Sequence, residues 1–318
     1  MKNPKRIVAV IPCYNEGESL SYTIAALIDV RKKLLPKYEL DVMFINDGSK
    51  DDTQDVIEAA AKAHDFIFYR QFSRNAGHQA ALRAGLNAAV DYDATVMLDA
   101  DMQHPPELIP DMIAKWEEGY KVVQMLRSDD KQKPGFFKYM LSRCFYVVIN
   151  TISDLKLEYG SSDFRLADRS VVETVAESRE HDLFLRGYFT WLPASRTSIK
   201  YNPNERVAGV PKYTLKKSLD LASKGILQFS EKPLRMAMGL GIFFAVTSFL
   251  YGLILTLLYI TGGVHAVSGW TSLMVVVLFC FGINFILLGI IGSYLAHSIS
   301  IQKERPEYVI ATQKLRTF

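Results

Sequence analysis

Two aspartates separated by a single residue follow an apolar run in the segment LDADMQHPPE, residues 98–107. If that run is a β-strand, its alternation directs the carboxylates of Asp99 and Asp101 to the same side. Two like charges at that spacing repel each other unless something positive lies between them. The pattern indicates either a divalent-cation site at the carboxyl end of a strand or two solvated acids in a loop.

Strand-like and helix-like segments alternate along the N-terminal part and must position this pair. The sequence predicts strands at 6–12, 39–47, 66–72, 94–101 and 121–126. It predicts helices at 18–35, 52–63, 78–90 and 106–118. Apolar strands separated by helices of this length favour a doubly wound α/β domain, whose mostly parallel sheet is covered on both faces.

Polar residues follow four successive predicted strands, at the edge where such sheets bind ligands. The segments are IPCYNEGES, INDGSKDDT, SRNAGHQ and LDADMQH. Turn formation and helix capping could explain any one of them. Acids and amides after all four strands instead favour a nucleotide site. The sequence contains neither GxGxxG nor GxxxxGK[ST], which disfavours a dinucleotide dehydrogenase or a P-loop NTPase.

Two long uncharged segments in the C-terminal third predict a membrane-embedded part. Residues 236–260 and 271–296 lack charged side chains, and each exceeds the roughly 20 residues that cross a hydrocarbon core. Basic residues flank the pair, whereas its connector TGGVHAVSGW has no Lys or Arg. The positive-inside rule then predicts a multi-pass protein of the cell (inner or plasma) membrane with both termini and the N-terminal domain in the cytoplasm. Two buried helices of a soluble core are the alternative.

The motifs VIPCYNEGESL, INDGSKDDT, RNAGHQAAL and LDADMQHPPE, in this order and spacing, resemble those of the family-two glycosyltransferases with a GT-A fold. The segments SSDFRLADR, FLRGYFTWL and ERVAGVPKY, followed by two apolar helices, are similar to the bacterial polyisoprenyl-phosphate glycosyltransferases. That group includes bactoprenol glucosyltransferases, with dolichol-phosphate mannose synthases as more distant relatives. Two departures are Asn46, where the family often has Asp, and GVPKY, where Gly-x-Ser-Lys is commoner.

The resemblance implies a membrane-bound, inverting glycosyltransferase. It would move a sugar from a nucleotide diphosphate sugar, which we interpret as a UDP-sugar, to polyisoprenyl (undecaprenyl) phosphate. An α-linked donor would give a β-linked lipid-phosphate sugar for cell-envelope glycan modification. The implied cofactor is a divalent cation, Mg²⁺ or Mn²⁺. The expected partners are the donor, the acceptor and the lipid bilayer, with a homo-oligomer left open and no nucleic acid.

Site residues follow from these motifs. Asp101 is expected to be a catalytic residue and the direct metal ligand, because a hard cation held by carboxylates neutralises a diphosphate leaving group. Asp99 and Gln103 complete the predicted metal set. The predicted nucleotide-sugar site comprises Pro12, Tyr14, Asn15, Glu16, Asp47, Asp99 and Arg127. The acceptor phosphate is expected at Arg206 and Lys212, which alternatively belong only to a basic membrane flank.

The second catalytic assignment is Asp163 of SSDFRL, which matches the residue usually proposed as a base in the related enzymes. A phosphomonoester has a second pKa near 6, so the acceptor carries little proton to remove at pH 7. A positioning role is therefore equally consistent with Asp163, and Asp182 is a rival for the same place. We leave His78 out of the ligand set, and the role of Arg74 stays open.

The expected organisation is a GT-A domain at 1–212, a juxtamembrane interfacial helix at 213–233, a transmembrane hairpin at 234–296 and a cytoplasmic tail at 297–318. The aromatic segment 136–152 is a second candidate interfacial helix. A processive polysaccharide synthase shares the fold, but the sequence lacks a QxxRW segment and further membrane helices. An inactive sugar-nucleotide-binding membrane protein would be expected to lose acids that this sequence retains. A nucleotidyltransferase could use the same acids, but it would leave the two apolar segments unexplained.

Overall fold

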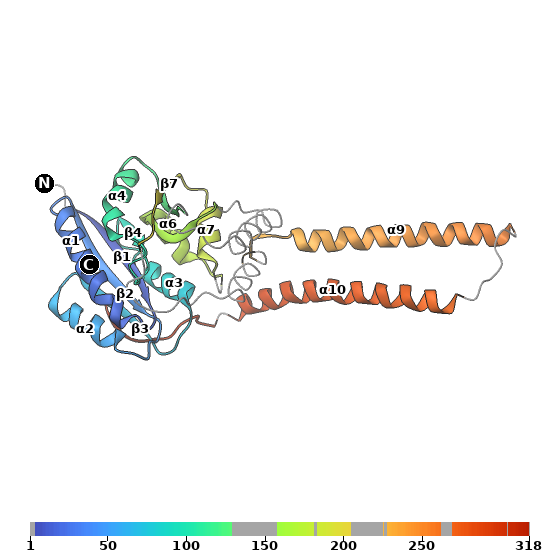
Figure 1. Ribbon diagram of the computed structural model, residues 1–318, viewed down its shortest axis with the longest axis horizontal. Coiled ribbons are helices and arrows are strands. Elements are labelled where there is room, and N and C mark those ends of the chain that lie inside the picture. Colours follow the sequence, from blue (N-terminus) through green and yellow to red (C-terminus); the bar gives the residue numbers. More distant parts are fainter. Residues whose placement is uncertain are drawn as a thin grey trace.

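A computed structural model describes residues 4–128, 158–180, 183–204, 225, 228–261, 269–303 and 305–317. Within these residues, an α/β domain lies at one end and two long helices project from it (Figure 1). The predicted interfacial helix at 136–152 and most of the one at 213–233 lie outside the described residues, as do Arg206, Lys212 and Asp182.

The described residues form an eight-stranded sheet in the order β7-β5-β6-β4-β1-β2-β3-β8. Its strands are β1 (Lys5–Cys13), β2 (Tyr38–Asn46), β3 (Ile67–Phe72), β4 (Ala94–Met97), β5 (Val122–Arg127), β6 (Ser161–Asp168), β7 (Arg196–Tyr201) and β8 (Ile310–Lys314). Strand β1 pairs in parallel with β2 and β4, and β2 with β3, whereas β6 and β8 are antiparallel to their neighbours. The predicted α/β class with a mostly parallel sheet is confirmed.

Helices cover both faces of this sheet, as the near-continuous apolar strands require. They are α1 (Gly17–Leu34), α2 (Thr53–Ala63), α3 (His78–Ala88), the 3₁₀ turn η1 (Pro106–Leu108), α4 (Ile109–Glu117), α6 (Arg169–Glu177) and α7 (Leu185–Trp191). Alternate residues of β1 enter different cores. Ile7 and Ile11 pack in the cluster that contains side chains of α1, α2 and α4, while Val8 and Val10 join that of α3, α6 and α7.

The fourth strand is shorter than predicted. It ends at Met97, and residues 98–103 form a turn in which Met102 has a φ of 63°. Strand alternation therefore does not orient Asp99 and Asp101, contrary to our expectation. The other four predicted strands and the four predicted helices occur with ends shifted by one or two residues, except that the last helix begins as η1.

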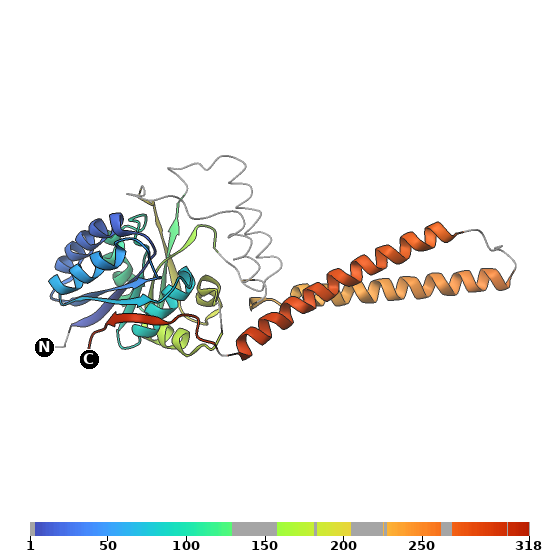
Figure 2. The same ribbon diagram turned by 90° about the horizontal axis from the view of Figure 1, so that it is seen from below.

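Strand β8 comes from the chain after the second long helix and pairs with the edge strand β3 (Figure 2). The sequence pattern does not predict a strand there. Just beyond β8, Arg316 Nη1 contacts the Asp41 carboxylate at 2.5 Å, and Asp41 has no exposed surface. Tyr92 donates a hydrogen bond of 2.9 Å to the same oxygen. The C-terminal segment thus neutralises a buried acid of the sheet.

Replacing Arg316 by alanine is expected to lower the stability of the α/β domain by about 2–4 kcal/mol, because it leaves a buried carboxylate without its main partner. Arg31 remains 3.6 Å from the other Asp41 oxygen. The stability lost in Arg316→Ala should therefore be smaller than for a buried carboxylate with no basic neighbour. A decrease in melting temperature of about 5–15 °C would report this. The control is Lys32→Ala, which breaks an exposed pair with Asp29 and should change little. Equal melting temperatures for the two variants would contradict the role of Arg316.

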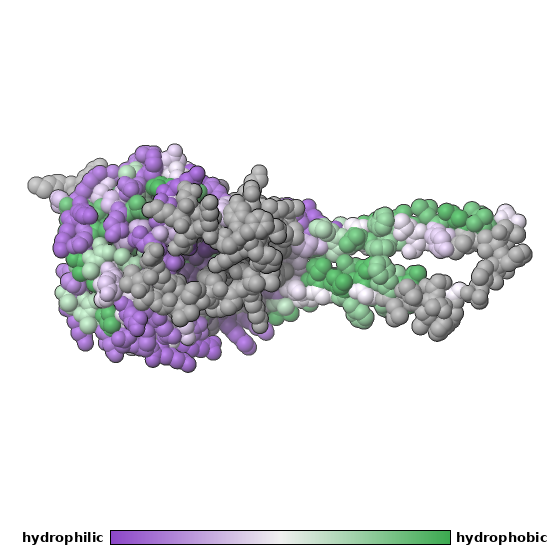
Figure 3. Space-filling model, viewed as in Figure 1, coloured by the Kyte–Doolittle hydropathy of each residue, from purple (hydrophilic) through white to green (hydrophobic). Residues whose placement is uncertain are grey.

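The two projecting helices are α9 (Lys232–Ile260) and α10 (Trp270–Gln302). Their described surfaces are mainly hydrophobic, in contrast to the hydrophilic surface of the α/β domain (Figure 3). Apolar windows at Lys232–Ile254 and Phe279–Gln302 are long enough to cross a membrane, and only 6% and 0% of the residues in them are buried. That exposure argues against helices of a soluble core.

Candidate active site

The pairing of β4 with β6 brings two predicted site residues from distant parts of the chain to the same end of the sheet. Strands β4 and β6 are antiparallel, with Met97 opposite Arg165. Asp99 follows Met97 by two residues and Asp163 precedes Arg165 by two, so both acids lie at this end of the strand pair. Because β1, β2, β3 and β4 are parallel neighbours in the sheet, their polar carboxyl ends lie along the same edge. The candidate site is therefore at that edge.

Three basic side chains surround the Asp163 carboxylate, which is only 8% exposed. Arg186 of α7 contacts it at 3.1 Å, and Arg165 of β6 at 3.5 Å. His78, the first residue of α3, places Nε2 3.3 Å from Asp163 and 3.8 Å from Asp99. This imidazole therefore bridges the two acids. His78, which we left out of the ligand set, thus lies beside two of the predicted site residues.

The basic neighbours determine the charge of Asp163. Burial alone would raise the pKa of this carboxyl, but the charge of Arg186, the hydrogen bond with His78 and the charges of His78 and Arg165 hold it well below its usual range. Burial lowers the pKa of His78, yet the contacts with Asp163 and Asp99 outweigh this and raise it. Burial also lowers the pKa of Arg165 to about 10. The cluster thus holds an ionised carboxylate among cations.

Arg165 is fixed independently of Asp163. Its guanidinium carbon lies 4.6 Å from the centre of the Phe189 ring, and Nη2 donates a hydrogen bond to the Ser162 carbonyl. The side chain is almost fully buried. A buried arginine stacked on an aromatic ring keeps its orientation, so Arg165 provides a rigid support for the carboxylate.

The turn that carries Asp99 and Asp101 is held by His104. The Asp99 N–H donates a 3.0 Å hydrogen bond to His104 Nδ1, and the imidazole stacks on Phe164 with ring centres 5.0 Å apart. Asp101 accepts a hydrogen bond from the Gln103 N–H and is 5% exposed, whereas the Asp99 side chain is 35% exposed. Asp99 is therefore the more accessible carboxylate. Sequence analysis gave His104 no role.

No group of three or more His, Cys, Asp and Glu residues suited to a metal occurs among the described residues. The donor set nevertheless fits a hard cation of the Mg²⁺ type, which takes one or two carboxylates and completes its shell with water and substrate phosphates. Asp99 and Asp101 supply two carboxylates on one short turn, and Gln103 adds an amide oxygen. A metal site made only by protein side chains is not required for this chemistry.

The residues predicted around the nucleotide lie at the same edge but differ in accessibility. Pro12 is buried in β1, Tyr14 and Glu16 are half-buried, and Asn15 is exposed with a φ of 52°. The Asn15 side chain accepts a hydrogen bond from the Lys50 N–H, which joins the turn after β1 to the turn after β2. Their contact with a nucleotide remains a prediction.

Asp47 is buried and supports the loop before α3. Its carboxylate accepts hydrogen bonds from the N–H groups of Ala76 and Gly77 and from the Asn75 amide. Burial raises its pKa, although the backbone bonds oppose this. Gly48, at a φ of 65°, lets the turn approach this loop, because a Cβ would lie 2.7 Å from the Arg74 carbonyl carbon. These contacts position His78, while the predicted ribose contact of Asp47 is not tested by them.

Arg127 ends β5, and its backbone N–H donates to the Gly160 carbonyl at 2.9 Å. Gly160 has a φ of 77°, and a Cβ there would lie 2.5 Å from the Arg127 carbonyl oxygen. This close approach fixes the start of β6 beside the end of β5. Arg74 is exposed in the loop after β3. The predicted acceptor residues cannot be located relative to this edge, since they are outside the described ranges.

Comparison with known proteins shows similarity over nearly the whole chain. The profile of the family described as Glycosyl transferase family 2 matches residues 8–176. The uncharacterized glycosyltransferase YkcC of Bacillus subtilis is 38% identical over 301 residues, covering 95% of this chain and 92% of that protein. The bactoprenol glucosyl transferase of Shigella phage SfV is 37% identical over 309 residues, covering 97% and 99% of the two chains.

Solved structures give a more distant match. One is glucosyl-3-phosphoglycerate synthase from Mycobacterium tuberculosis in complex with Mn²⁺, UDP-glucose and phosphoglyceric acid, at 17% identity and a TM-score of 0.44. The match covers 70% of this chain and 78% of that one. Mannosyl-3-phosphoglycerate synthase from Rubrobacter xylanophilus matches with 13% identity and a TM-score of 0.45, over 74% and 75% of the chains.

Proposed function

The chain belongs to glycosyl transferase family 2, and from this membership we propose that it is a membrane-bound enzyme transferring a sugar from a nucleotide diphosphate sugar to polyisoprenyl phosphate. One observation carries the proposal: the sheet edge with Asp99, Asp101 and Asp163 belongs to the same chain as two exposed apolar helices. A soluble acceptor would not require those helices. The full-length similarity to a protein named bactoprenol glucosyl transferase supports a polyisoprenyl acceptor.

In the proposed reaction, a phosphate oxygen of the acceptor attacks the anomeric carbon of the sugar. The bond between that carbon and the diphosphate oxygen breaks, and its electron pair stays on the diphosphate. Attack from the face opposite the leaving group inverts the configuration, so an α-linked donor gives a β-linked product. Both partners of the reaction are anionic, which makes neutralisation and alignment the main tasks of the protein.

Arg186, Arg165 and His78 serve the alignment. Asp163 contacts all three of these basic groups, and His78 also lies 3.8 Å from the Asp99 carboxylate. We infer that Asp163 holds Arg186 and His78 in place beside the anionic substrates. Arg186 directs two donors of its guanidinium, Nε and Nη2, at the Asp163 carboxylate, which fixes the orientation of the charged group.

Asp99 and Asp101 would hold a divalent cation, with the Gln103 amide oxygen as a further ligand. When bound, such a cation neutralises the charge that develops on the diphosphate. The His104 hydrogen bond to the Asp99 backbone keeps the turn in shape for this role. Within this proposal, the donor is a UDP-sugar and the acceptor is undecaprenyl phosphate.

A transfer assay tests the proposal. Full-length protein in detergent is supplied with undecaprenyl phosphate and, in turn, radiolabelled UDP- and GDP-sugars, together with Mg²⁺ or Mn²⁺. We expect one sugar to appear on the lipid phosphate with one donor. A polymeric product would instead identify a processive synthase. Donor binding without transfer under every condition would identify an inactive binding protein.

The proposed topology predicts the side of the membrane reached by the connection between α9 and α10. A cysteine introduced at position 263 should react with a membrane-impermeant thiol reagent added outside intact cells. A cysteine introduced at exposed Asp111 of the α/β domain should react only after the cells are opened. Cys144 and Cys280 are replaced by Ser in both variants, because the one remaining cysteine, Cys13, is buried. Protection of position 263 in intact cells would contradict the two-span arrangement.

A further inference from the structure

The start of helix α7 is held by two glutamine side chains from other parts of the chain. The Phe184 N–H donates a 2.9 Å hydrogen bond to Gln228 Oε1, and the Leu185 N–H donates one of 3.1 Å to Gln79 Oε1. Phe184 and Leu185 are both buried. The first N–H groups of a helix have no acceptor within it, and buried ones cannot turn to water instead. Each glutamine therefore supplies a bond that α7 cannot make for itself.

The next residue of α7, Arg186, reaches the candidate active site. Its Nη2 lies 3.1 Å from the Asp163 carboxylate. Gln79 directly follows His78, whose Nε2 lies 3.3 Å from the same carboxylate. The hydrogen bond between Leu185 and Gln79 thus joins the two helix starts that carry the basic groups. A shift of the first turn of α7 would carry Arg186 away from Asp163.

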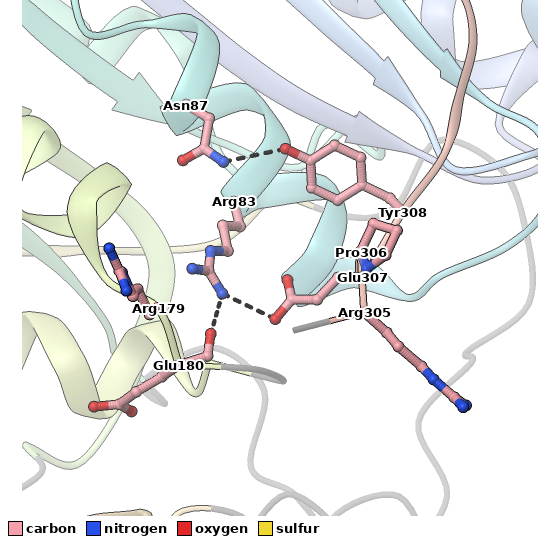
Figure 4. Close-up of a pocket in the computed structure, with 8 residues that line it drawn as sticks. All are labelled: Arg83, Asn87, Arg179, Glu180, Arg305, Pro306, Glu307 and Tyr308. Carbon is pink, nitrogen blue, oxygen red and sulfur yellow. Dashed lines mark hydrogen bonds and ion pairs between the residues drawn. The ribbon is translucent and has the colours of Figure 1, made fainter. Parts of the chain in front are cut away.

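Helix α3, which carries Gln79, is itself firmly anchored. Arg83 of α3 pairs with Glu307 at 2.9 Å. The same guanidinium donates hydrogen bonds to the backbone carbonyls of Ser178 and Glu180. Figure 4 shows Arg83 between Glu180 and Glu307. Because these contacts hold α3 from two sides, Gln79 ties α7 to a fixed helix.

The other acceptor, Gln228, belongs to the segment 228–230, which leads into α9 and contacts α10. The Tyr294 hydroxyl of α10 donates a 2.6 Å hydrogen bond to the carbonyl of Ser230. Helix α7 lies on the side of the α/β domain from which α9 and α10 project (Figure 1). A continuous series of contacts therefore runs from α10 through segment 228–230 to the helix that carries Arg186.

The chain before α9 also packs closely against the start of α7. A Cβ at position 225 would lie 3.2 Å from the Phe184 ring, so Gly225 permits the two segments to approach. Phe229 packs against the core cluster that contains Leu185 and Phe189. These apolar contacts on both sides of Gln228 in the sequence keep its amide beside the first turn of α7.

We propose that Gln228 is a positioning residue, whose Oε1 keeps the first turn of α7 in the orientation that directs Arg186 at Asp163. The chain that leads into α9 would then set the alignment of the candidate active site as well as attach the enzyme to the membrane. Gln228 acts in this proposal through Arg186 and not on the substrates. Its effect on sugar transfer rests on the proposed function, whereas its hold on α7 does not.

The test compares variants of Gln228 in full-length protein in detergent. Q228M keeps the length of the side chain but has only a weak acceptor, so its turnover should fall about tenfold or more. Q228E keeps an oxygen that can accept the Phe184 N–H, and its turnover should stay within about threefold of the wild type. Q228N withdraws the acceptor by one carbon and should behave like Q228M, which provides a second variant if Q228M does not fold.

The matched control is Gln71→Met, which removes an exposed hydrogen bond from the Thr312 hydroxyl and should transfer sugar normally. Normal turnover in Q228M and Q228N would overturn the proposal. Equal losses in Q228M and Q228E would do so as well, because the acceptor oxygen would then not be the group that matters.

A double-mutant comparison shows whether Gln228 acts through Arg186. In the R186Q background, Q228M should change turnover by less than about twofold, because the side chain that Gln228 aligns is already absent. A general disturbance of the domain would lower turnover by a further factor of about ten in this background as well. That additive result would overturn the positioning role.

Hydrogen exchange on the same preparations gives a readout that needs no sugar transfer. In peptides that contain the start of α7, Q228M should speed backbone amide exchange about tenfold or more, whereas Q228E and Gln71→Met should match the wild type. Unchanged exchange in Q228M would overturn the proposal. A wild type that transfers no sugar, with the expected exchange pattern in the variants, contradicts the proposed function and leaves the hold of Gln228 on α7 standing.

Discussion

Replacing Asp101 by asparagine is expected to lower sugar transfer by about 10³-fold or more. A carboxylate that holds a cation against a diphosphate leaving group contributes several kcal/mol to transition-state stabilisation. Asparagine keeps the side-chain oxygen that accepts the Gln103 N–H, so the turn at 98–103 should persist. The loss would then report the missing charge rather than a change of fold.

Three measurements make this result specific. The melting temperature of Asp101→Asn should stay close to that of the wild type. The matched variant Asp111→Asn removes an exposed carboxylate of α4 and should transfer normally. Treatment of the wild type with EDTA should reproduce the loss, and added Mg²⁺ or Mn²⁺ should restore activity. Full transfer by chelator-treated wild type would refute the proposed metal role of Asp99 and Asp101.

The central part of the fold was predictable because its signals are local. Each of the first five strands is an apolar run bounded by polar turn residues, and a helix of recognisable period follows each of the first four. Strand β8 lacks such a signal, since three of its five residues are exposed and its pairing with β3 joins positions about 240 residues apart. The early end of β4 depends on the positive φ of Met102 and on His104 packing against Phe164. These are tertiary effects that a strand pattern does not contain.

The acidic residues of the candidate site could be predicted from the sequence, but its basic residues could not. Asp99, Asp101 and Asp163 stand in recognisable motifs, and the antiparallel register of β6 beside β4 brings two of them together. Arg186 is on a different element from Asp163, so only the fold reveals their 3.1 Å contact. A signal for Arg186 was present in FLRGYFTWL, a segment that carries the family resemblance and contains a single charge. His78 looked like an ordinary residue at a helix start, and its bridging position appears only when the fold brings the two acids together.

The role of Asp163 can be decided by the pH dependence of its asparagine variant. Because Arg186, His78 and Arg165 outweigh burial and hold its pKa well below the usual range, the carboxylate stays ionised throughout pH 6–8.5. Any stability gained from this depressed pKa is present above about pH 4 and is lost only as the pH falls through the folded-state value. The second pKa of an acceptor phosphate is near 6. A carboxylate with a pKa far below that value is a weak base and would remove little of the phosphate proton. The depressed pKa therefore supports our proposal that Asp163 positions its basic neighbours.

We therefore expect Asp163→Asn to lower turnover by about 10²-fold or more, through misplaced Arg186, with a mutant-to-wild-type ratio constant within about twofold from pH 6 to pH 8.5. Turnover and acceptor KM must be separated, because removing a negative charge also favours binding of an anionic acceptor. General-base catalysis predicts instead a deficit of about 10²–10⁴-fold at pH 6 that shrinks as the acceptor ionises.

His78 is the necessary control, since losing Asp163 removes a contact that raises the His78 pKa. In Asp163→Asn, His78 would lose its proton at a lower pH than in the wild type. This change alone could make the mutant-to-wild-type turnover ratio depend on pH. The comparison is therefore repeated between His78→Gln and His78→Gln/Asp163→Asn, where no imidazole titrates at this position. A flat ratio in that background identifies Asp163 as the residue that aligns Arg186. A ratio that recovers tenfold or more by pH 8.5 assigns it proton transfer, despite its depressed pKa.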